Sequence, residues 1–381
     1  MSGCLDLVHG IFMKRKKWLL VLALVVVLIL YFGLWPVPIK PVSWKAPAWE
    51  GYQGVHAVND KFTAVEVISL GGDTQPEHIV LAEDGKLYAS VTRGNILRMN
   101  PDGTNQEVYA NTGGRPLGFD FDSAGQLIVA DAHRGLLSIS PDRQITLLAD
   151  KVAGDPIRFA DAVVVAGSGK IYFSDATTRF YAKDGIVGGG PEDVSSLDII
   201  ENSATGRILE HNPATQATRI VGKGISFANG IALSNDETML FVAETGRYRV
   251  WKIDIMANDL DVGQDTQQAS VLLDNLPGFP DNLMRGLDGK IWVGIPGPRI
   301  AALDKFAGAP FIRKLFMRLP RFLGPSPVHY GHAIAFTEDG EVVADFQDPV
   351  GAFPTITGVT ETVDRLYLHN LNKQGLGWLP H

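Results

Sequence analysis

The segment Asp84-Gly85-Lys86-Leu87-Tyr88-Ala89 joins a turn to a short β-type run, and the chain contains six copies of this pattern. Five copies have a glycine in the turn, and the fourth has a glutamate. The copies are roughly 40–70 residues apart, and a period near 40–50 residues with several short strands per unit is typical of β-propeller blades. The sequence therefore predicts an all-β fold, a six-bladed β-propeller. The six turns contain Gly85, Gly125, Gly169, Glu237, Gly289 and Gly340.

An apolar run of eighteen residues without a charge lies near the N-terminus, at positions 18–35. As a helix it would be about 27 Å long, close to the thickness of the hydrocarbon core of a bilayer. Lys14-Arg15-Lys16-Lys17 precedes it, so the positive-inside rule predicts a transmembrane helix with a cytoplasmic N-terminus. The alternative is a cleaved signal peptide. Its apolar region is usually shorter and ends in a small-residue cleavage site, whereas this run leads into Pro36-Val37-Pro38.

These features divide the chain into four parts. We expect a cytoplasmic basic tail over residues 1–17, a transmembrane anchor over 18–35, a stiff Pro-rich spacer over 36–59 and the propeller over 60–381. The expected location is the inner or plasma membrane, crossed once, with the propeller in the periplasm or outside the cell. The formal net charge of −8 gives no electrostatic support for nucleic-acid binding.

Two inserts lengthen the repeat. The first, at residues 176–203, is polar and rich in glycine, which predicts a long loop over one face of the propeller. The second, at residues 304–327, alternates apolar side chains with lysine and arginine, and its apolar positions keep helical spacing. We therefore expect a basic amphipathic helix over residues 305–323, which either caps the propeller or lies on an anionic membrane surface.

Polar residues stand where the innermost strands should begin, next to the central channel. Glu77, Asp161, Asn229 and Asp281 occupy corresponding positions in their repeats, so four strands would aim carboxylate or amide oxygens at one axis. Such oxygen donors, with no cysteine among them, suit Ca²⁺ or Mg²⁺ better than Zn²⁺. Three carboxylates that converge without a cation would repel one another. This predicts a divalent-cation site; the alternative, for each residue alone, is a polar group at a turn or strand end.

Several segments resemble the strictosidine-synthase-like and adipocyte-plasma-membrane-associated-protein-like family, and the resemblance runs from about Gln75 to the C-terminus. They are residues 129–137 (VADAHRGLL), 171–175 (IYFSD), 226–230 (SFANG), 275–282 (NLPGFPDN) and 291–294 (IWVG). The wider superfamily is similar to gluconolactonases, paraoxonases and diisopropyl-fluorophosphatase, which are six-bladed propellers that hold a divalent cation, usually Ca²⁺, in the channel. The resemblance implies that Glu77, Asp161, Asn229 and Asp281 are the matching ligands.

The chain departs from this family pattern in three places. The third-blade motif, usually Phe-x-Asn-Asp, reads Phe159-Ala160-Asp161-Ala162, so an amide ligand becomes a carboxylate. Leu117 stands where paraoxonases have a histidine, so a histidine dyad is not expected. Gly331-His332-Ala333-Ile334, taken as the start of blade six, holds no acid that matches the catalytic glutamate of strictosidine synthase, so that activity is not expected.

Together these observations predict a membrane-anchored, Ca²⁺-dependent hydrolase whose substrate is a small lactone or aryl ester, with Mg²⁺ as another possible cation. The cation would polarise the substrate carbonyl. Asp281 would be a metal ligand and either the nucleophile or the general base. His332 would face the channel on blade six as a base or substrate contact, or else be a structural hydrogen-bonding group. The alternative function is a non-enzymatic propeller that binds a ligand or protein and holds a structural metal.

Overall fold

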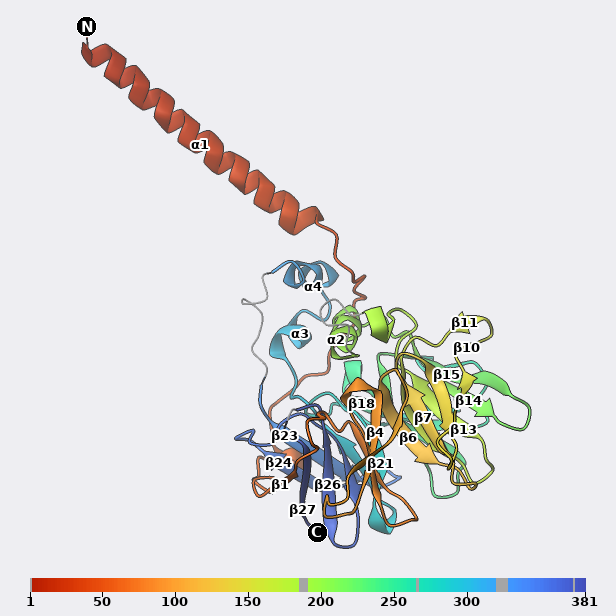
Figure 1. Ribbon diagram of the computed structural model, residues 1–381. Coiled ribbons are helices and arrows are strands. Elements are labelled where there is room, and N and C mark those ends of the chain that lie inside the picture. Colours follow the sequence, from red (N-terminus) through yellow and green to blue (C-terminus); the bar gives the residue numbers. More distant parts are fainter. Residues whose placement is uncertain (1, 185–190, 265–266, 320–327, 373) are drawn as a thin grey trace.

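Six sheets, antiparallel except for one strand pair in the third of them, are arranged as the blades of a β-propeller, and a long helix extends away from them (Figure 1). The computed structural model describes residues 2–184, 191–264, 267–319, 328–372 and 374–381. The predicted six-bladed all-β fold is confirmed. The extended helix is α1 (Ser2–Leu34), and its stretch Arg15–Leu34 is long and apolar enough to cross a membrane.

Each of the first three blades begins at the central channel and ends at the rim. Blade one contains β2 (His78–Leu81), β3 (Leu87–Ser90), β4 (Asn95–Met99) and β5 (Glu107–Asn111). Blade two contains β6 (Pro116–Phe121), β7 (Leu127–Asp131), β8 (Gly135–Ile139) and β9 (Ile145–Ala149). Blade three contains β12 (Ala160–Val165), β13 (Ile171–Asp175), β14 (Gly206–Asn212), β15 (Ala217–Ile225) and the short β19 (Leu260–Asp261).

The other three blades complete the ring. Blade four contains β16 (Ala228–Leu233), β17 (Met239–Glu244), β18 (Arg249–Asp254) and β20 (Ala269–Leu273). Blade five contains β21 (Leu283–Arg285), β22 (Ile291–Gly294), β23 (Gly331–Phe336) and β24 (Val342–Asp348). Blade six contains β25 (Ile356–Glu361), β26 (Arg365–Asn370), β27 (Leu376–Pro380) and β1 (Glu66–Ile68), so it joins both ends of the propeller chain.

Short elements lie outside the blades. They are the hairpin β10 (Lys151–Val152) and β11 (Asp155–Pro156), the helices α2 (Pro191–Glu201), α3 (Ala301–Lys305) and α4 (Pro310–Phe316), and the 3₁₀ turns η1 (Gly54–His56), η2 (Thr92–Gly94), η3 (Ala182–Asp184), η4 (Thr245–Arg247) and η5 (Leu287–Gly289). The apolar core lies between neighbouring blades: Phe241 of blade four, for example, packs in one cluster with Ile291 and Ile334 of blade five.

The sixth sequence copy was assigned to the wrong blade. Gly340 lies in the turn between β23 and β24, which are the third and fourth strands of blade five. The inner hairpin of blade six instead turns at residues 362–365, where Thr362 N donates to Arg365 O over 2.8 Å. This turn contains no glycine, and the helical insert between β22 and β23 shifts the repeat, so the turn of blade six does not follow the sequence pattern.

The two inserts also differ from prediction. The predicted loop at residues 176–203 contains helix α2, and its glycines at 188–190 lie outside the described residues. The predicted basic helix over 305–323 is the shorter α4, and residues 320–323 also lie outside the described part. Two of its basic side chains are buried: Arg313 donates to Ile200 O (2.8 Å), and Arg318 to Trp35 O (2.8 Å). Arg313 thus ties the insert to the end of α2 and Arg318 ties it to the end of α1, whereas Phe311 is exposed.

The Pro-rich segment at residues 36–59, hereafter the strap, lies against the propeller. Val42 N donates to Glu201 O at the end of α2 (2.9 Å), and Trp44 N donates to Ala307 O after α3 (3.2 Å). Ile39 is fully buried. The strap therefore crosses the same face that carries α2, α3 and α4, and α1 joins the propeller on that side (Figure 1).

Buried carboxylates at the ends of second strands fix the loops that enter the channel. Each accepts a backbone N–H from the segment just before the inner strand of its own blade. The pairs are Asp131 Oδ1 with Arg115 N (3.0 Å), Asp175 Oδ1 with Phe159 N (2.9 Å) and Glu244 Oε1 with Ser226 N (2.8 Å). Each acid therefore sets the position of the residues that follow at the channel.

We expect Asp175→Ala to lower the free energy of unfolding by about 3–5 kcal/mol, because it removes one of the two carboxylates paired with the buried Arg207 and leaves the N–H groups of Arg158 and Phe159 without their acceptor. Urea unfolding of the full-length protein in detergent, followed by tryptophan fluorescence, measures the change. Glu107→Ala is the control: its ion pairs with Arg98 and Arg143 are exposed, so its loss should cost about 1 kcal/mol or less. Equal effects of the two substitutions would contradict the role given to Asp175.

Candidate metal centre

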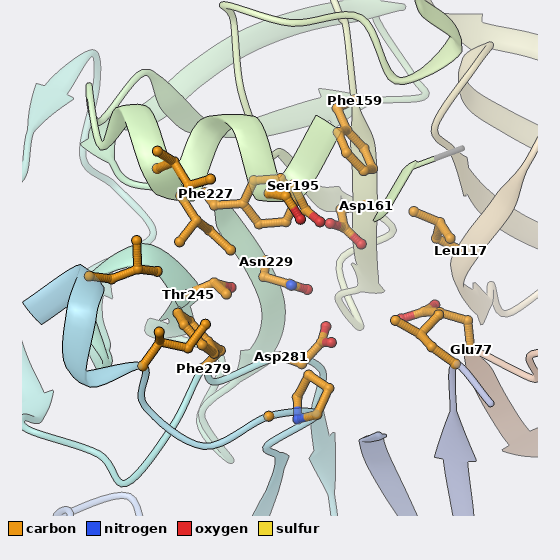
Figure 2. A pocket seen from close by; sticks show the side chains of 18 of the residues that line it. Glu77, Leu117, Phe159, Asp161, Ser195, Phe227, Asn229, Thr245, Phe279 and Asp281 are labelled. Carbon is orange, nitrogen blue, oxygen red and sulfur yellow. The ribbon is translucent and has the colours of Figure 1, made fainter. Parts of the chain in front are cut away.

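A cavity of ≈ 330 Å³ lies at the end of the channel where the inner strands begin (Figure 2). Its walls come from the strand ends, from α2 and from α3, which cover this face of the propeller. Most of the wall is apolar and includes Leu117, Phe159, Ile199, Phe227, Phe279 and Leu303. A small apolar ligand would therefore lose water on most sides as it enters.

The four residues predicted to bind a cation all line this cavity. Glu77 directly precedes β2, Asp161 and Asn229 are the second residues of β12 and β16, and Asp281 lies two residues before β21. Figure 2 shows their side chains directed into one common space. The structure therefore brings together four residues that are far apart in the sequence, and cation binding by them stays a prediction.

The other two blades place different residues at the equivalent positions. Leu117, the second residue of β6, lines the cavity with an apolar side chain. Thr357, the second residue of β25, donates its hydroxyl to Glu77 O over 3.0 Å. Blade six thus contributes Thr357 at this level of the channel, and not His332.

Close approach of the inner strands requires glycine beside the cavity. A Cβ atom on Gly230 would lie 2.4 Å from Asp281 O and 2.3 Å from Leu283 N, which is far below van der Waals contact. The missing side chain lets blades four and five meet here. As a consequence, Asn229 and Asp281 lie close enough for the Asn229 side chain to hydrogen-bond to the Asp281 carboxylate.

The buried carboxylates repel one another. Burial, followed by the charges of Glu77 and Asp281, raises the pKa of Asp161 well above its usual range, and Arg115 opposes this effect. Burial and the Glu77 charge likewise raise the pKa of Asp281, against the hydrogen bond from Asn229. A divalent cation among these groups would offset the repulsion and replace their protons.

By chemical type, the donor atoms suit a hard divalent cation. Asn229 Oδ1 is buried and has no hydrogen-bond partner among the residues that the structure describes, while the side chain donates to Asp281. Together with the carboxylates of Glu77, Asp161 and Asp281, this oxygen forms the set of ligands that Ca²⁺ prefers and that Mg²⁺ accepts.

Asn282 is a supporting residue that the sequence analysis missed. It is buried, and its side-chain amide donates to Glu77 Oε1 (2.6 Å) and to Glu77 O (2.9 Å). These bonds orient the Glu77 carboxylate, as outer-shell groups do at metal sites. Its position directly after Asp281, at the end of the segment NLPGFPDN, is the sequence feature that could have identified it.

His332 lies outside this cavity. It is the second residue of β23, the third strand of blade five, and is fully buried. Its Nε2 lies 3.2 Å from both carboxylate oxygens of Asp345, and His56 Nδ1 lies 2.7 Å from Asp345 Oδ2. The prediction that His332 contacts the channel is therefore wrong. It followed from placing the repeat around Gly340 in blade six, whereas this repeat belongs to blade five. These three residues form a separate group with metal-ligating atoms, the His56–His332–Asp345 cluster.

Comparison with known proteins agrees with this architecture. The profile of the SMP-30/Gluconolactonase/LRE-like region matches residues 76–309. The strictosidine-synthase-like protein 7 of Arabidopsis thaliana is 33% identical over 308 residues, which are 77% of this chain and 76% of that protein. The adipocyte plasma membrane-associated protein of Homo sapiens is 27% identical over 358 residues, or 87% and 81% of the two chains.

A solved gluconolactonase from Xanthomonas campestris shares the fold, with a TM-score of 0.58 and 17% identity over 83% of this chain and 88% of that one. The profile covers more than half of the chain, and the curated relatives extend the match across the propeller. The chain therefore belongs to the SMP-30/gluconolactonase/LRE-like family, and within it is similar to the strictosidine-synthase-like proteins.

Proposed function

We propose that this protein is a membrane-anchored, Ca²⁺-dependent hydrolase of lactones or aryl esters. The observation that carries the proposal is Asn229 Oδ1, which has no hydrogen-bond partner among the described residues and lies with three buried carboxylates in the wall of an apolar cavity. A site of this kind suits a substrate with an apolar body and one polar, hydrolysable group. The name gluconolactonase, given to a solved protein of the same fold, supports a lactone as the reacting group.

The residues of the cavity fall into three roles in this proposal: cation binding, proton transfer or nucleophilic attack, and packing against the substrate. Glu77, Asp161, Asn229 and Asp281 would hold the cation, which when bound supplies Lewis-acid polarisation of a carbonyl oxygen. The Asp281 carboxylate, oriented by the Asn229 amide, would take a proton from the attacking water or attack the carbonyl carbon itself. Phe159, Phe227 and Phe279 would hold the acyl or aryl group and exclude other water.

Anchoring by α1 is the second part of the proposal. No residue of the stretch Arg15–Leu34 is buried, and it meets the length and apolarity that a membrane span needs. Relatives named adipocyte plasma membrane-associated protein match over most of the chain. The basic residues at 14–17 would keep the N-terminus in the cytoplasm, with the propeller in the periplasm or outside the cell.

We expect Asp281→Asn to lower the kcat for phenyl acetate or a δ-lactone by at least about 100-fold, because the amide cannot take a proton or attack. Steady-state hydrolysis by the full-length protein in detergent measures this, with circular dichroism as the test of folding. Glu107→Gln, on the rim strand β5, is the matched control and should keep full activity. A wild-type protein that binds Ca²⁺ but hydrolyses neither substrate class would favour the non-enzymatic binding function.

Ca²⁺ removal should make stability depend on pH. Because the pKa values of Asp161 and Asp281 are raised in the folded protein, protonation stabilises it below the ordinary aspartate pKa of about 4. This contribution is lost as pH rises through the raised values. The Tm of the metal-free protein should therefore fall as the pH rises above about 4. Near neutral pH, adding Ca²⁺ at 100 times its Kd should raise this Tm by about 4 °C. Thermal unfolding with and without chelator measures both, and identical curves would count against the site.

The topology can be tested with a fusion protein. Alkaline phosphatase attached after His381 should be active, because it folds only outside the cytoplasm and the anchor places the C-terminus there. The full-length protein should also sediment with membranes and resist extraction by alkaline carbonate. A mature soluble form beginning near residue 36 would identify the N-terminal helix as a signal peptide instead.

A further inference from the structure

The His56–His332–Asp345 cluster joins the strap to blade five. His56 ends the turn η1, His332 is on β23 and Asp345 is on the neighbouring strand β24. His332 and Asp345 are buried, and His56 keeps only 15% of its side chain exposed. The three ligand atoms lie within 4.8 Å of one another.

The spacing of these atoms is close to that of a zinc site. Asp345 Oδ2 is 2.7 Å from His56 Nδ1 and 3.2 Å from His332 Nε2. Tetrahedral zinc with bonds of about 2.0–2.1 Å holds neighbouring ligand atoms roughly 3.3 Å apart. Small side-chain rotations would therefore admit the ion. Two imidazoles with one carboxylate suit Zn²⁺, whereas Ca²⁺ and Mg²⁺ prefer oxygen alone.

Further residues orient the carboxylate of the cluster. The side-chain amides of Gln347 and Asn59 both donate to Asp345 Oδ1, which leaves Oδ2 directed at His56. Tyr330 in turn donates its hydroxyl to Gln347 Oε1 over 2.6 Å. Such outer-shell bonds fix this carboxylate before an ion binds, while Nδ1 of His332 is buried and has no hydrogen-bond partner among the described residues.

The hydroxyl group of Tyr52, whose ring packs beside the cluster, makes no hydrogen bond to the described residues. Tyr52 belongs to the strap, and its ring stacks on Tyr330 at 5.1 Å and lies 5.7 Å from the ring of His332. Its hydroxyl oxygen is buried and has no hydrogen-bond partner within the described ranges. A water on the ion's fourth position would give this hydroxyl a partner.

We propose that His56, His332 and Asp345 form a Zn²⁺ site that fastens the strap to blade five. The site is independent of the channel, since none of its three ligands lines the cavity. Two of its three ligand atoms are imidazole nitrogens, whereas the four channel residues provide carboxylate and amide oxygens. Because His56 comes from the strap and the other two ligands from the blade, the ion would tie the segment that follows α1 to the propeller.

The test uses full-length protein in detergent, stripped with a chelator and then given Zn²⁺. We expect about one zinc per chain by mass spectrometry of the desalted protein, and a Tm raised by about 4 °C at 100 times the zinc Kd. His56→Ala should lose both the bound zinc and the Tm rise. His56→Cys should keep them, because a thiolate replaces the imidazole. His381→Ala changes a histidine outside the cluster and should behave as wild type.

The channel provides the second control. Asp281→Asn should still bind zinc and show the zinc-induced Tm rise, which separates this site from the proposed Ca²⁺ site. Zinc binding that persists in His56→Ala but is lost in Asp281→Asn would overturn the proposal. It would also be overturned if the wild-type protein kept no zinc, because the cluster would then be a hydrogen-bonded joint alone.

Discussion

The structure depends on one recurring interaction, a buried carboxylate that binds the backbone N–H groups of the loop leading into the channel. Asp131, Asp175 and Glu244 do this in blades two, three and four. Asp348 of blade five binds Phe353 N before the inner strand of blade six. A buried N–H group without a partner is costly, so these loops have little freedom to move. These contacts fix the segments that lead to Asp161 and Asn229, whereas Glu77 N and Asp281 N donate to the backbone carbonyls of Ser90 and Gly294. Rigid support of this kind is what a site for a small ion requires.

Most of the fold and of the candidate site could be predicted because both follow the local repeat. A turn and the strand after it mark five blades, with glycine in four of these turns and Glu237 in the other. Glu77, Asp161, Asn229 and Asp281 stand at a similar distance before their turns. The sixth blade was missed because its turn has no glycine and an insert of helices interrupts blade five. That error moved His332 to the wrong strand. The insert between β22 and β23 lengthens blade five, so the next glycine turn falls near the position expected for a new blade. The spacing of turns in the sequence cannot distinguish such an insert from a new blade.

The direction of the arginine side chains in the second insert could not be predicted from the sequence either. The alternation of basic and apolar residues in the second insert predicted a basic amphipathic helix that either caps the propeller or lies on an anionic membrane surface. In the structure the guanidinium groups of Arg313 and Arg318 bind the backbone carbonyls of Ile200 and Phe32. An arginine can satisfy several carbonyls at once, so it suits the ends of helices and irregular segments that bury polar backbone. The pattern alone does not distinguish this use from an exposed one. Only the tertiary contacts, here with α2 and with the end of α1, decide between them.

The position of the cavity beneath α2 and α3 has a consequence for how molecules would reach it. Arg318 binds Phe32 O near the end of α1, and Arg313 binds the end of α2, so the apolar helix leaves the propeller on the same side as the cavity. If α1 spans a bilayer, that side faces the headgroups. The approach route is then a thin layer between protein and lipid, where amphiphiles are concentrated by partitioning and highly polar solutes are not. Access, as much as the shape of the cavity, would select what enters.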